Sequence, residues 1–90
     1  MLFMTIYTFS PENREAVIKR RVEKGGLVPA GAKVISEWSS LTGHRIFRVV
    51  EVEDPKAMLG ATLAWSDLGK IESYAIMPME EVLKVIATKK

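Results

Sequence analysis

The alternation of apolar and polar positions predicts four strands and three helices along the chain. Residues 2–9 (LFMTIYTF) are rich in β-branched and aromatic side chains, which is typical of a strand. One face of this strand carries Leu2, Met4 and Ile6, and the other carries Phe3, Thr5, Tyr7 and Phe9. Both faces are largely apolar, so we expect the strand to be covered on both sides. The face with Thr5 and Tyr7 is the more polar of the two.

Two serine- or aspartate-proline pairs predict helix starts, Ser10-Pro11 and Asp54-Pro55. The first helix is expected to run to about Lys24, where Gly25-Gly26 ends it. It should bury Ala16 or Val17, together with Ile18 and Val22. The second helix carries an apolar stripe that includes Trp65 and ends at Gly69, and residues 79–88 predict a third.

Residues 33–40 and 44–52 predict two strands joined in a hairpin. With Thr42-Gly43 as a two-residue turn, Glu37 falls opposite Arg48 and Trp38 falls opposite Phe47. This register pairs opposite charges on one face and aromatic rings on the other. Trp38 and Trp65 could form a platform for a ligand, but we expect both to pack in the core. Residues 71–77 predict the fourth strand.

The element order predicts a single α+β domain over residues 1–90, a ferredoxin-like βαββαβ fold with an extra C-terminal helix. Both long helices would then cover one face of an antiparallel sheet. A bare opposite face with Phe3, Tyr7, Phe9 and Ile76 would be a large exposed apolar patch. We therefore expect a homodimer closed through the sheets, with a cavity between them, and leave open whether such dimers form a higher oligomer.

Composition supports association with a second copy. Of the 90 residues, 48% are hydrophobic and none is cysteine, so a small domain lacks disulfides and thiolate metal ligands. A lone histidine, His44, argues against a zinc site. We expect no metal and no cofactor, which leaves oligomerisation as the added source of stability.

Charge and hydropathy exclude two classes of partner. The net charge is +2, and Lys19-Arg20-Arg21 lacks interleaved aromatic residues, so we interpret it as a solvated helix face and expect no nucleic acid. No apolar run approaches the length of a membrane span, so we expect no membrane partner. The apolar start lacks a basic flank and predicts a strand, not a signal peptide, which favours a cytoplasmic location.

Several short motifs resemble a known family. They are Met1-Leu2-Phe3-Met4, Pro29-Ala30-Gly31, Ser36-Glu37-Trp38, Glu51 followed by Asp54-Pro55, Trp65-Ser66-Asp67-Leu68, Ile71-Glu72 and Pro78. Over about residues 1–78 the chain resembles the proteins grouped as domain of unknown function 3303. The resemblance implies a dimeric α/β barrel, the superfamily that also holds antibiotic-biosynthesis monooxygenases and muconolactone isomerases, but it implies no activity. The chain departs from the family at Ile71, usually phenylalanine, and at Met77-Pro78-Met79, usually Pro-Val.

Five side chains are candidates for binding a ligand in the cavity. They are Thr5, Tyr7, Glu37, Arg48 and Tyr74. Glu37 and Arg48 would form an ion pair able to orient a polar ligand if their face is the barrel interior, or else a surface pair. The candidates for catalysis are this pair and His44, which titrates near neutrality but lies at a turn where side chains are commonly solvated.

These residues support three hypotheses for function. The first is a homodimer that binds a small apolar or aromatic molecule in the cavity. The second is an enzyme similar to cofactor-independent monooxygenases or isomerases, which requires His44, Tyr7 or the Glu37–Arg48 pair to face inward with a shifted pKa. The third is a structural or regulatory dimer with nothing bound.

Overall fold

The computed structural model describes residues 1–88, and its elements follow the order β-α-β-β-α-β with a further helix. The strands are β1 (Leu2–Phe9), β2 (Ala32–Ser39), β3 (Arg45–Val52) and β4 (Gly69–Ile76). The helices are α1 (Arg14–Lys24), preceded by the short 3₁₀ turn η1 (Pro11–Asn13), α2 (Ala57–Trp65) and α3 (Met79–Thr88). Each predicted element is therefore present, with ends that differ by a few residues.

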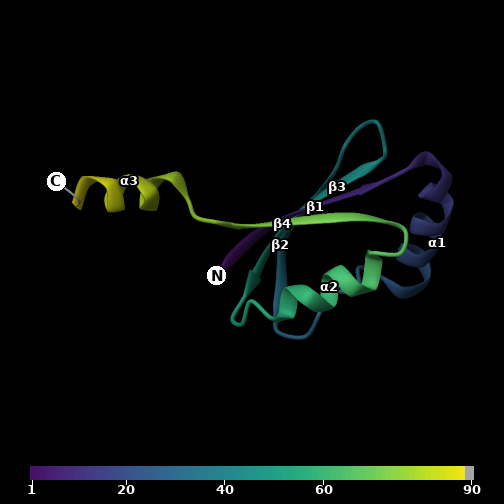
Figure 1. Ribbon diagram of the computed structural model, residues 1–90, viewed down its shortest axis with the longest axis horizontal. Helices are drawn as coiled ribbons and strands as arrows, with labels where there is room; N and C mark the ends of the chain where they lie inside the picture. Colours follow the sequence, from purple (N-terminus) through teal and green to yellow (C-terminus); the bar gives the residue numbers. More distant parts are fainter. Residues whose placement is uncertain (89–90) are drawn as a thin grey trace.

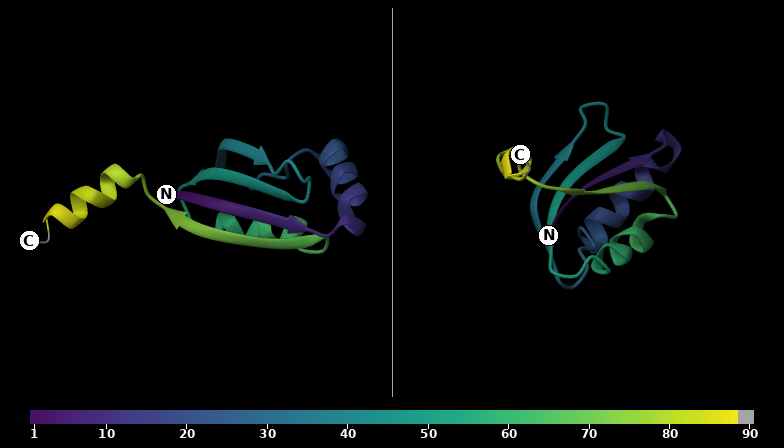
Figure 2. Two further views of the ribbon diagram at one scale, coloured as in Figure 1. Left: turned by 90° about the horizontal axis from the view of Figure 1, so that it is seen from above. Right: turned by 60° about the vertical axis from the view of Figure 1, so that its left-hand side comes forward.

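The four strands form one antiparallel sheet in the order β2-β3-β1-β4. Strand β1 lies in the middle, where Thr5 pairs with Arg48 of β3 on one side and with Ser73 of β4 on the other. Helices α1 and α2 both lie on the same side of this sheet (Figure 2). This arrangement is the ferredoxin-like α+β fold that the element pattern predicts.

The predicted hairpin register is confirmed, although its turn is longer than expected. Glu37 pairs with Arg48, and Trp38 pairs with Phe47. The backbone N–H of Ser40 donates to the carbonyl of Arg45, so four loop residues, not two, connect the last paired positions. The register survives because two extra loop residues, one on each strand, leave the cross-strand partners unchanged.

The helix-covered face of the sheet carries the core, and this corrects our assignment of the faces. Tyr7 and Phe9 are buried with Val17 of α1 and Trp65 of α2. Phe3, also expected on the bare face, packs against the second cluster of Val50, Val52 and Met58. Because both faces of β1 are apolar, the sequence pattern alone could not identify which face the helices cover.

Three further packing predictions were wrong. Ile18 and Val22 are exposed, so α1 buries only Val17. Trp38, which we expected in the core, is 66% exposed. It lies on the open face with Phe47, because the hairpin register places their pair on the side of the sheet opposite Glu37 and Arg48.

The open face of the sheet carries a group of apolar side chains. The cross-strand register places eight apolar or aromatic side chains there: Leu2, Met4, Ile6, Trp38, Phe47, Val49, Tyr74 and Ile76. Trp38, Tyr74 and Ile76 are exposed, and the other five are partly covered by their neighbours. No helix of the described chain covers this face (Figure 2).

Helix α3 extends away from the sheet and from both other helices (Figure 1). Met79, Leu83 and Ile86 lie along one side of it and are exposed. The longest extent of the molecule is consequently 52 Å, against 28 and 18 Å in the other directions. Within the described residues, α3 and the other helices are too short or too polar to cross a membrane.

Candidate functional site

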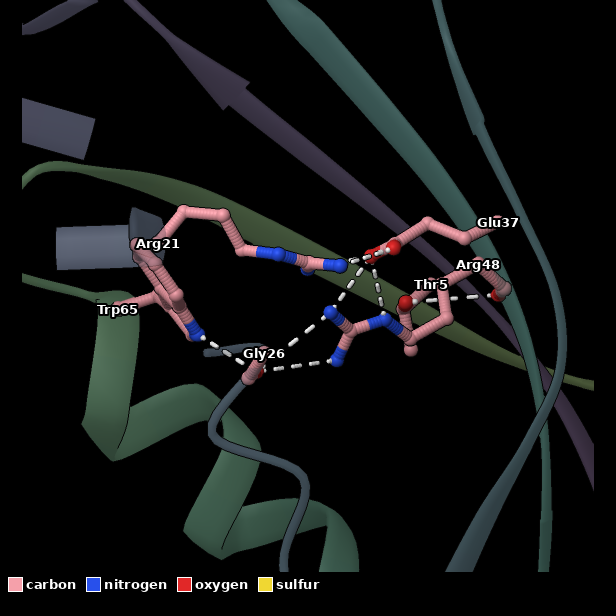
Figure 3. Close-up of polar contacts among 6 residues, drawn as sticks. All are labelled: Thr5, Arg21, Gly26, Glu37, Arg48 and Trp65. Carbon is pink, nitrogen blue, oxygen red and sulfur yellow. Dashed lines mark hydrogen bonds and ion pairs between the residues drawn. The ribbon is translucent and has the colours of Figure 1, made fainter. Parts of the chain in front are cut away.

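Glu37 of β2 lies between two arginines. Arg21 of α1 donates to both carboxylate oxygens of Glu37, at 3.0 and 2.7 Å. Arg48 of β3 donates from Nε and Nη2 to Oε2, at 3.0 and 2.6 Å (Figure 3). These charge-assisted bonds join one helix to two strands at the helix-covered face of the sheet.

A β-bulge brings Glu37 to this face. Val34 pairs with Val50 and faces the core, so simple alternation would place Glu37, three residues later, on the open face. The register shifts between Val34 and Ser36, and the extra residue, Ile35, restores Glu37 to the side of Arg48. Arg21 reaches the same place because it lies one helical turn after the buried Val17.

The network is partly shielded from water and carries two positive charges for one negative. The side chain of Arg48 is only 13% exposed, and those of Glu37 and Arg21 are 25% and 45% exposed. The hydrogen bonds from Arg21, with those from Arg48, hold the pKa of the Glu37 carboxyl below its ordinary value. The same contact with Glu37 raises the pKa of Arg21. Glu37 and Arg21 are therefore charged at neutral pH.

A small cavity of about 50 Å³ lies beside the network, between the sheet and the two helices. Its lining is mainly apolar and aromatic and comprises Thr5, Tyr7, Val17, Arg21, Ile46, Arg48, Ala61, Trp65 and Ile71. This volume would hold a few water molecules. A wider groove of about 440 Å³ shares Val17, Arg21 and Ile46 with it, and extends toward the β2–β3 loop.

Outside the network of Glu37 and the two arginines, three side chains of the cavity wall make hydrogen bonds to backbone carbonyls, and only one of these bonds is short. The Tyr7 hydroxyl donates to the carbonyl of Trp65 at 2.9 Å, and the Thr5 hydroxyl contacts the carbonyl of Arg48 at 3.4 Å. The indole N–H of Trp65 approaches the carbonyl of Gly26 at 3.4 Å (Figure 3). Burial raises the pKa of Tyr7, the nearby Asp67 carboxylate adds to this rise, and Arg20 opposes it.

The structure brings four of the predicted ligand-binding residues together. Thr5, Tyr7 and Arg48 line the cavity, and Glu37 forms the predicted ion pair with Arg48. They lie under the helices, however, on the face opposite the one that was expected to close a barrel. Whether they bind a ligand stays a prediction.

Tyr74 and His44 lie apart from this group. Tyr74 is on the open face, where its hydroxyl donates to Glu72 at 2.6 Å; this contact raises its pKa. His44 lies in the β2–β3 loop with Nδ1 at 2.7 Å from the Thr42 hydroxyl, and it does not line the cavity.

Sequence reasoning missed Arg21, and for Trp65 it favoured core packing over a ligand platform. Arg21 belongs to a run of three basic residues, which we interpreted as a solvated helix face. Its spacing of four from Val17, the one buried residue of α1, was the signal that it faces the sheet. Arg20 is also engaged, because it pairs with Asp67 through two bonds of 2.7 Å and lies over the Trp65 ring.

Solved structures with this fold include proteins of different descriptions. A NIPSNAP domain protein from Burkholderia xenovorans is 17% identical, with a TM-score of 0.55 over 87% of this chain and 94% of that one. Protein Atu4242 from Agrobacterium tumefaciens is 14% identical, with a TM-score of 0.54 over 87% and 93%. A candidate antibiotic biosynthesis monooxygenase from Deinococcus radiodurans is 14% identical, with a TM-score of 0.50 over 84% and 91%. At these identities the likeness shows the fold alone, the ferredoxin-like α+β fold.

No curated protein matches the sequence. The profile of one family, described as a domain of unknown function, matches residues 1–90. The resemblance noted in the short motifs is therefore confirmed, and the chain belongs to the DUF3303 family.

Proposed function

We propose that this protein binds a small apolar or aromatic molecule in the cavity between the sheet and helices α1 and α2. The observation that carries the proposal is the composition of the cavity wall, which is apolar and aromatic with a single charged cluster at one side. Ligand sites commonly combine such a lining with a few converging polar groups that fix orientation. The rings of Tyr7 and Trp65 pack against each other, with centroids 5.7 Å apart, and together form the aromatic part of the cavity wall.

The cavity is small, but its surroundings can admit a larger molecule. It lies next to the 440 Å³ groove between α1 and the β2–β3 loop, so a ligand can extend from one into the other along Val17 and Ile46. The side chain of Arg21 lines both, so its guanidinium group lies where the two spaces meet.

The alternative is an enzyme similar to monooxygenases or isomerases. It draws support from the fold shared with a candidate antibiotic biosynthesis monooxygenase. General acid–base catalysis works best with a group whose pKa lies near the operating pH. Here the pKa of Glu37 is lowered and that of Tyr7 is raised, so both move away from neutrality. These shifts favour binding over acid–base catalysis by the residues of this cavity.

The functional form in this proposal is a homodimer that buries the open face of the sheet. Eight apolar or aromatic side chains lie on that face. The exposed apolar residues of a monomeric protein are usually isolated, whereas a contiguous group marks an interaction surface. A second copy is the fitting partner because a two-fold axis pairs the same apolar patch with itself. The same face also carries acidic and basic side chains that can pair across such an interface: Glu51, Glu72, Arg45 and Lys70. The expected cytoplasmic location stays a prediction, to be checked by cell fractionation.

Tryptophan fluorescence tests the binding proposal directly. The chain contains two tryptophans, so Trp38→Phe leaves Trp65, on the cavity wall, as the only reporter. In this background, titration with benzyl alcohol, benzamide and benzoate, which do not emit in the tryptophan range, is expected to give a saturable change in Trp65 emission. Ala61→Phe should fill the cavity and abolish the change, whereas Ala16→Phe, at an exposed position of α1, should preserve it.

The proposal fails if none of the probes alters Trp65 emission up to their solubility limits while the variant is folded by circular dichroism. It also fails if Ala61→Phe and Ala16→Phe respond identically. In either case the structural or regulatory dimer becomes the preferred interpretation.

A further inference from the structure

The charged cluster beside the cavity is unbalanced. Among the described residues, Arg21 and Arg48 form ion pairs with one carboxylate only, that of Glu37. Two guanidinium groups and one carboxylate leave a net charge of +1 at a place where the side chain of Arg48 is only 13% exposed. A buried excess charge is costly unless a partner compensates it, so the cluster favours an additional anion.

Arg48 also has hydrogen-bonding capacity that its protein partners use poorly. Nε and Nη2 donate to Glu37 at 3.0 and 2.6 Å. Nη1 reaches only the carbonyl of Gly26, at 3.5 Å, which is beyond the usual range of an N–H···O hydrogen bond. The same carbonyl also receives the indole N–H of Trp65 at 3.4 Å. A stronger acceptor in the cavity would give Nη1 a better partner.

Gly26 keeps the approach to both arginines open. A Cβ atom at this position would lie 3.2 Å from Nη1 of Arg21 and 3.2 Å from Nη2 of Arg48, so Gly26 lies beside both guanidinium groups (Figure 3). A side chain there would crowd the space beside them. The absence of one lets a ligand group approach both arginines from the cavity.

We propose that the ligand is an organic acid with one carboxylate, held by Arg48 and Arg21 beside Glu37, with its apolar or aromatic part against Tyr7 and Trp65. This inference rests on the proposed function, and it adds the chemical class of the ligand. A single carboxylate matches the net charge of +1, whereas a dianion such as a phosphate monoester would exceed it. Glu37 takes the Nε–Nη2 edge of Arg48, so the ligand carboxylate meets the other edge of this guanidinium group, formed by Nη1 and the second N–H of Nη2, which reaches only the Gly26 carbonyl at 3.5 Å.

A series of probes that share a ring and differ in charge tests the inference. In the Trp38→Phe background, benzoate is compared with benzamide and benzyl alcohol. Benzoate is expected to bind at least about tenfold more tightly than either neutral probe, as charge-assisted hydrogen bonds are stronger than neutral ones.

Three substitutions assign the preference to the cluster. Arg21→Gln, at a side chain that is 45% exposed, removes the excess charge and should abolish the preference for benzoate over benzamide. Glu37→Gln raises the net charge to +2 and should strengthen benzoate binding. Arg45→Gln removes a positive charge from an exposed residue outside the cluster and should leave the preference intact.

The possible results separate the inference from the proposed function. If no probe binds, the proposed function itself is wrong. If benzoate, benzamide and benzyl alcohol bind equally, the cavity binds apolar molecules but the organic-acid inference is overturned. A benzoate preference that persists in Arg21→Gln and weakens in Glu37→Gln would also overturn it.

Discussion

Arg48 of β3 and Glu37 of β2 are cross-strand neighbours whose side chains meet through two hydrogen bonds on the helix-covered face of the sheet. Arg21 then ties the same carboxylate to α1. This pair therefore links the hairpin to the helix layer, and its removal should affect both stability and binding.

Glu37→Gln is expected to destabilise the protein by about 1 to 3 kcal/mol, because two guanidinium groups lose a charged acceptor. Urea titration followed by circular dichroism measures the loss. Glu53→Gln, at an exposed residue of the β3–α2 loop, is the matched control and should change the free energy of unfolding by less than about 0.5 kcal/mol. Equal effects of the two substitutions would show that the ion pair contributes nothing specific.

The stabilisation from Glu37 should disappear in acid. Its pKa is lower in the folded protein than the ordinary value of 4.5, so the contribution is complete above that value and is lost as the pH falls through the folded pKa. The difference in stability between the wild type and Glu37→Gln is therefore expected to be largest near neutral pH and to vanish in acid. Urea titrations at several pH values check this, and a difference that stays constant with pH would contradict it. Asp67, whose pKa is also lowered by Arg20, is present in both proteins and cancels in the comparison.

The two tyrosines offer a matched pair of substitutions. Tyr7→Phe removes the shorter of two hydrogen bonds to the Trp65 carbonyl, which keeps only the N–H of Leu68 at 3.2 Å, and is expected to cost about 1 kcal/mol of unfolding free energy. Tyr74→Phe removes a hydroxyl from the exposed face and is expected to cost much less. Thermal and urea unfolding of the two variants compare them directly. A larger loss in Tyr74→Phe would indicate that the open face is buried in the protein in solution.

Trp38 tests the homodimer. Because this residue is 66% exposed in the single chain, Trp38→Lys should leave the fold intact while weakening association through the open face. An interface tryptophan of this kind commonly contributes enough that its loss raises the dimer dissociation constant by about 30-fold or more. Sedimentation velocity over a dilution series provides the measurement, and Val22→Lys, at an exposed position of α1, is the control. A wild-type protein that sediments as a monomer at micromolar concentration would overturn the dimer proposal.

Local patterns predicted the elements of this fold well, since each depends on neighbouring residues. Alternation defined the strands, proline and glycine marked the helix ends, and the charge pair Glu37–Arg48 identified the hairpin register. The register was robust because the observed loop differs from the predicted turn by one residue on each side.

Local patterns could not predict which face of the sheet the helices cover, nor that Arg21 joins Glu37 and Arg48. Both faces of β1 are apolar, so periodicity alone did not distinguish the core around Tyr7 from the open face around Ile6. The role of Arg21 depends on a contact with Glu37, sixteen residues away, that forms only when α1 packs beside the hairpin. The bulge at Ile35 has no strong local signal, yet it sets the face on which Glu37 lies.

The position of α3 makes its helical order a measure of association between chains. A ten-residue helix has too few internal hydrogen bonds to offset the cost of nucleation in water, and α3 has no extensive packing against the other described elements. Its helical order should therefore rise and fall with the fraction of chains whose α3 is held by a neighbour, while the sheet stays folded. The protection of the α3 amides from hydrogen exchange should therefore increase with protein concentration. This increase measures association without any label.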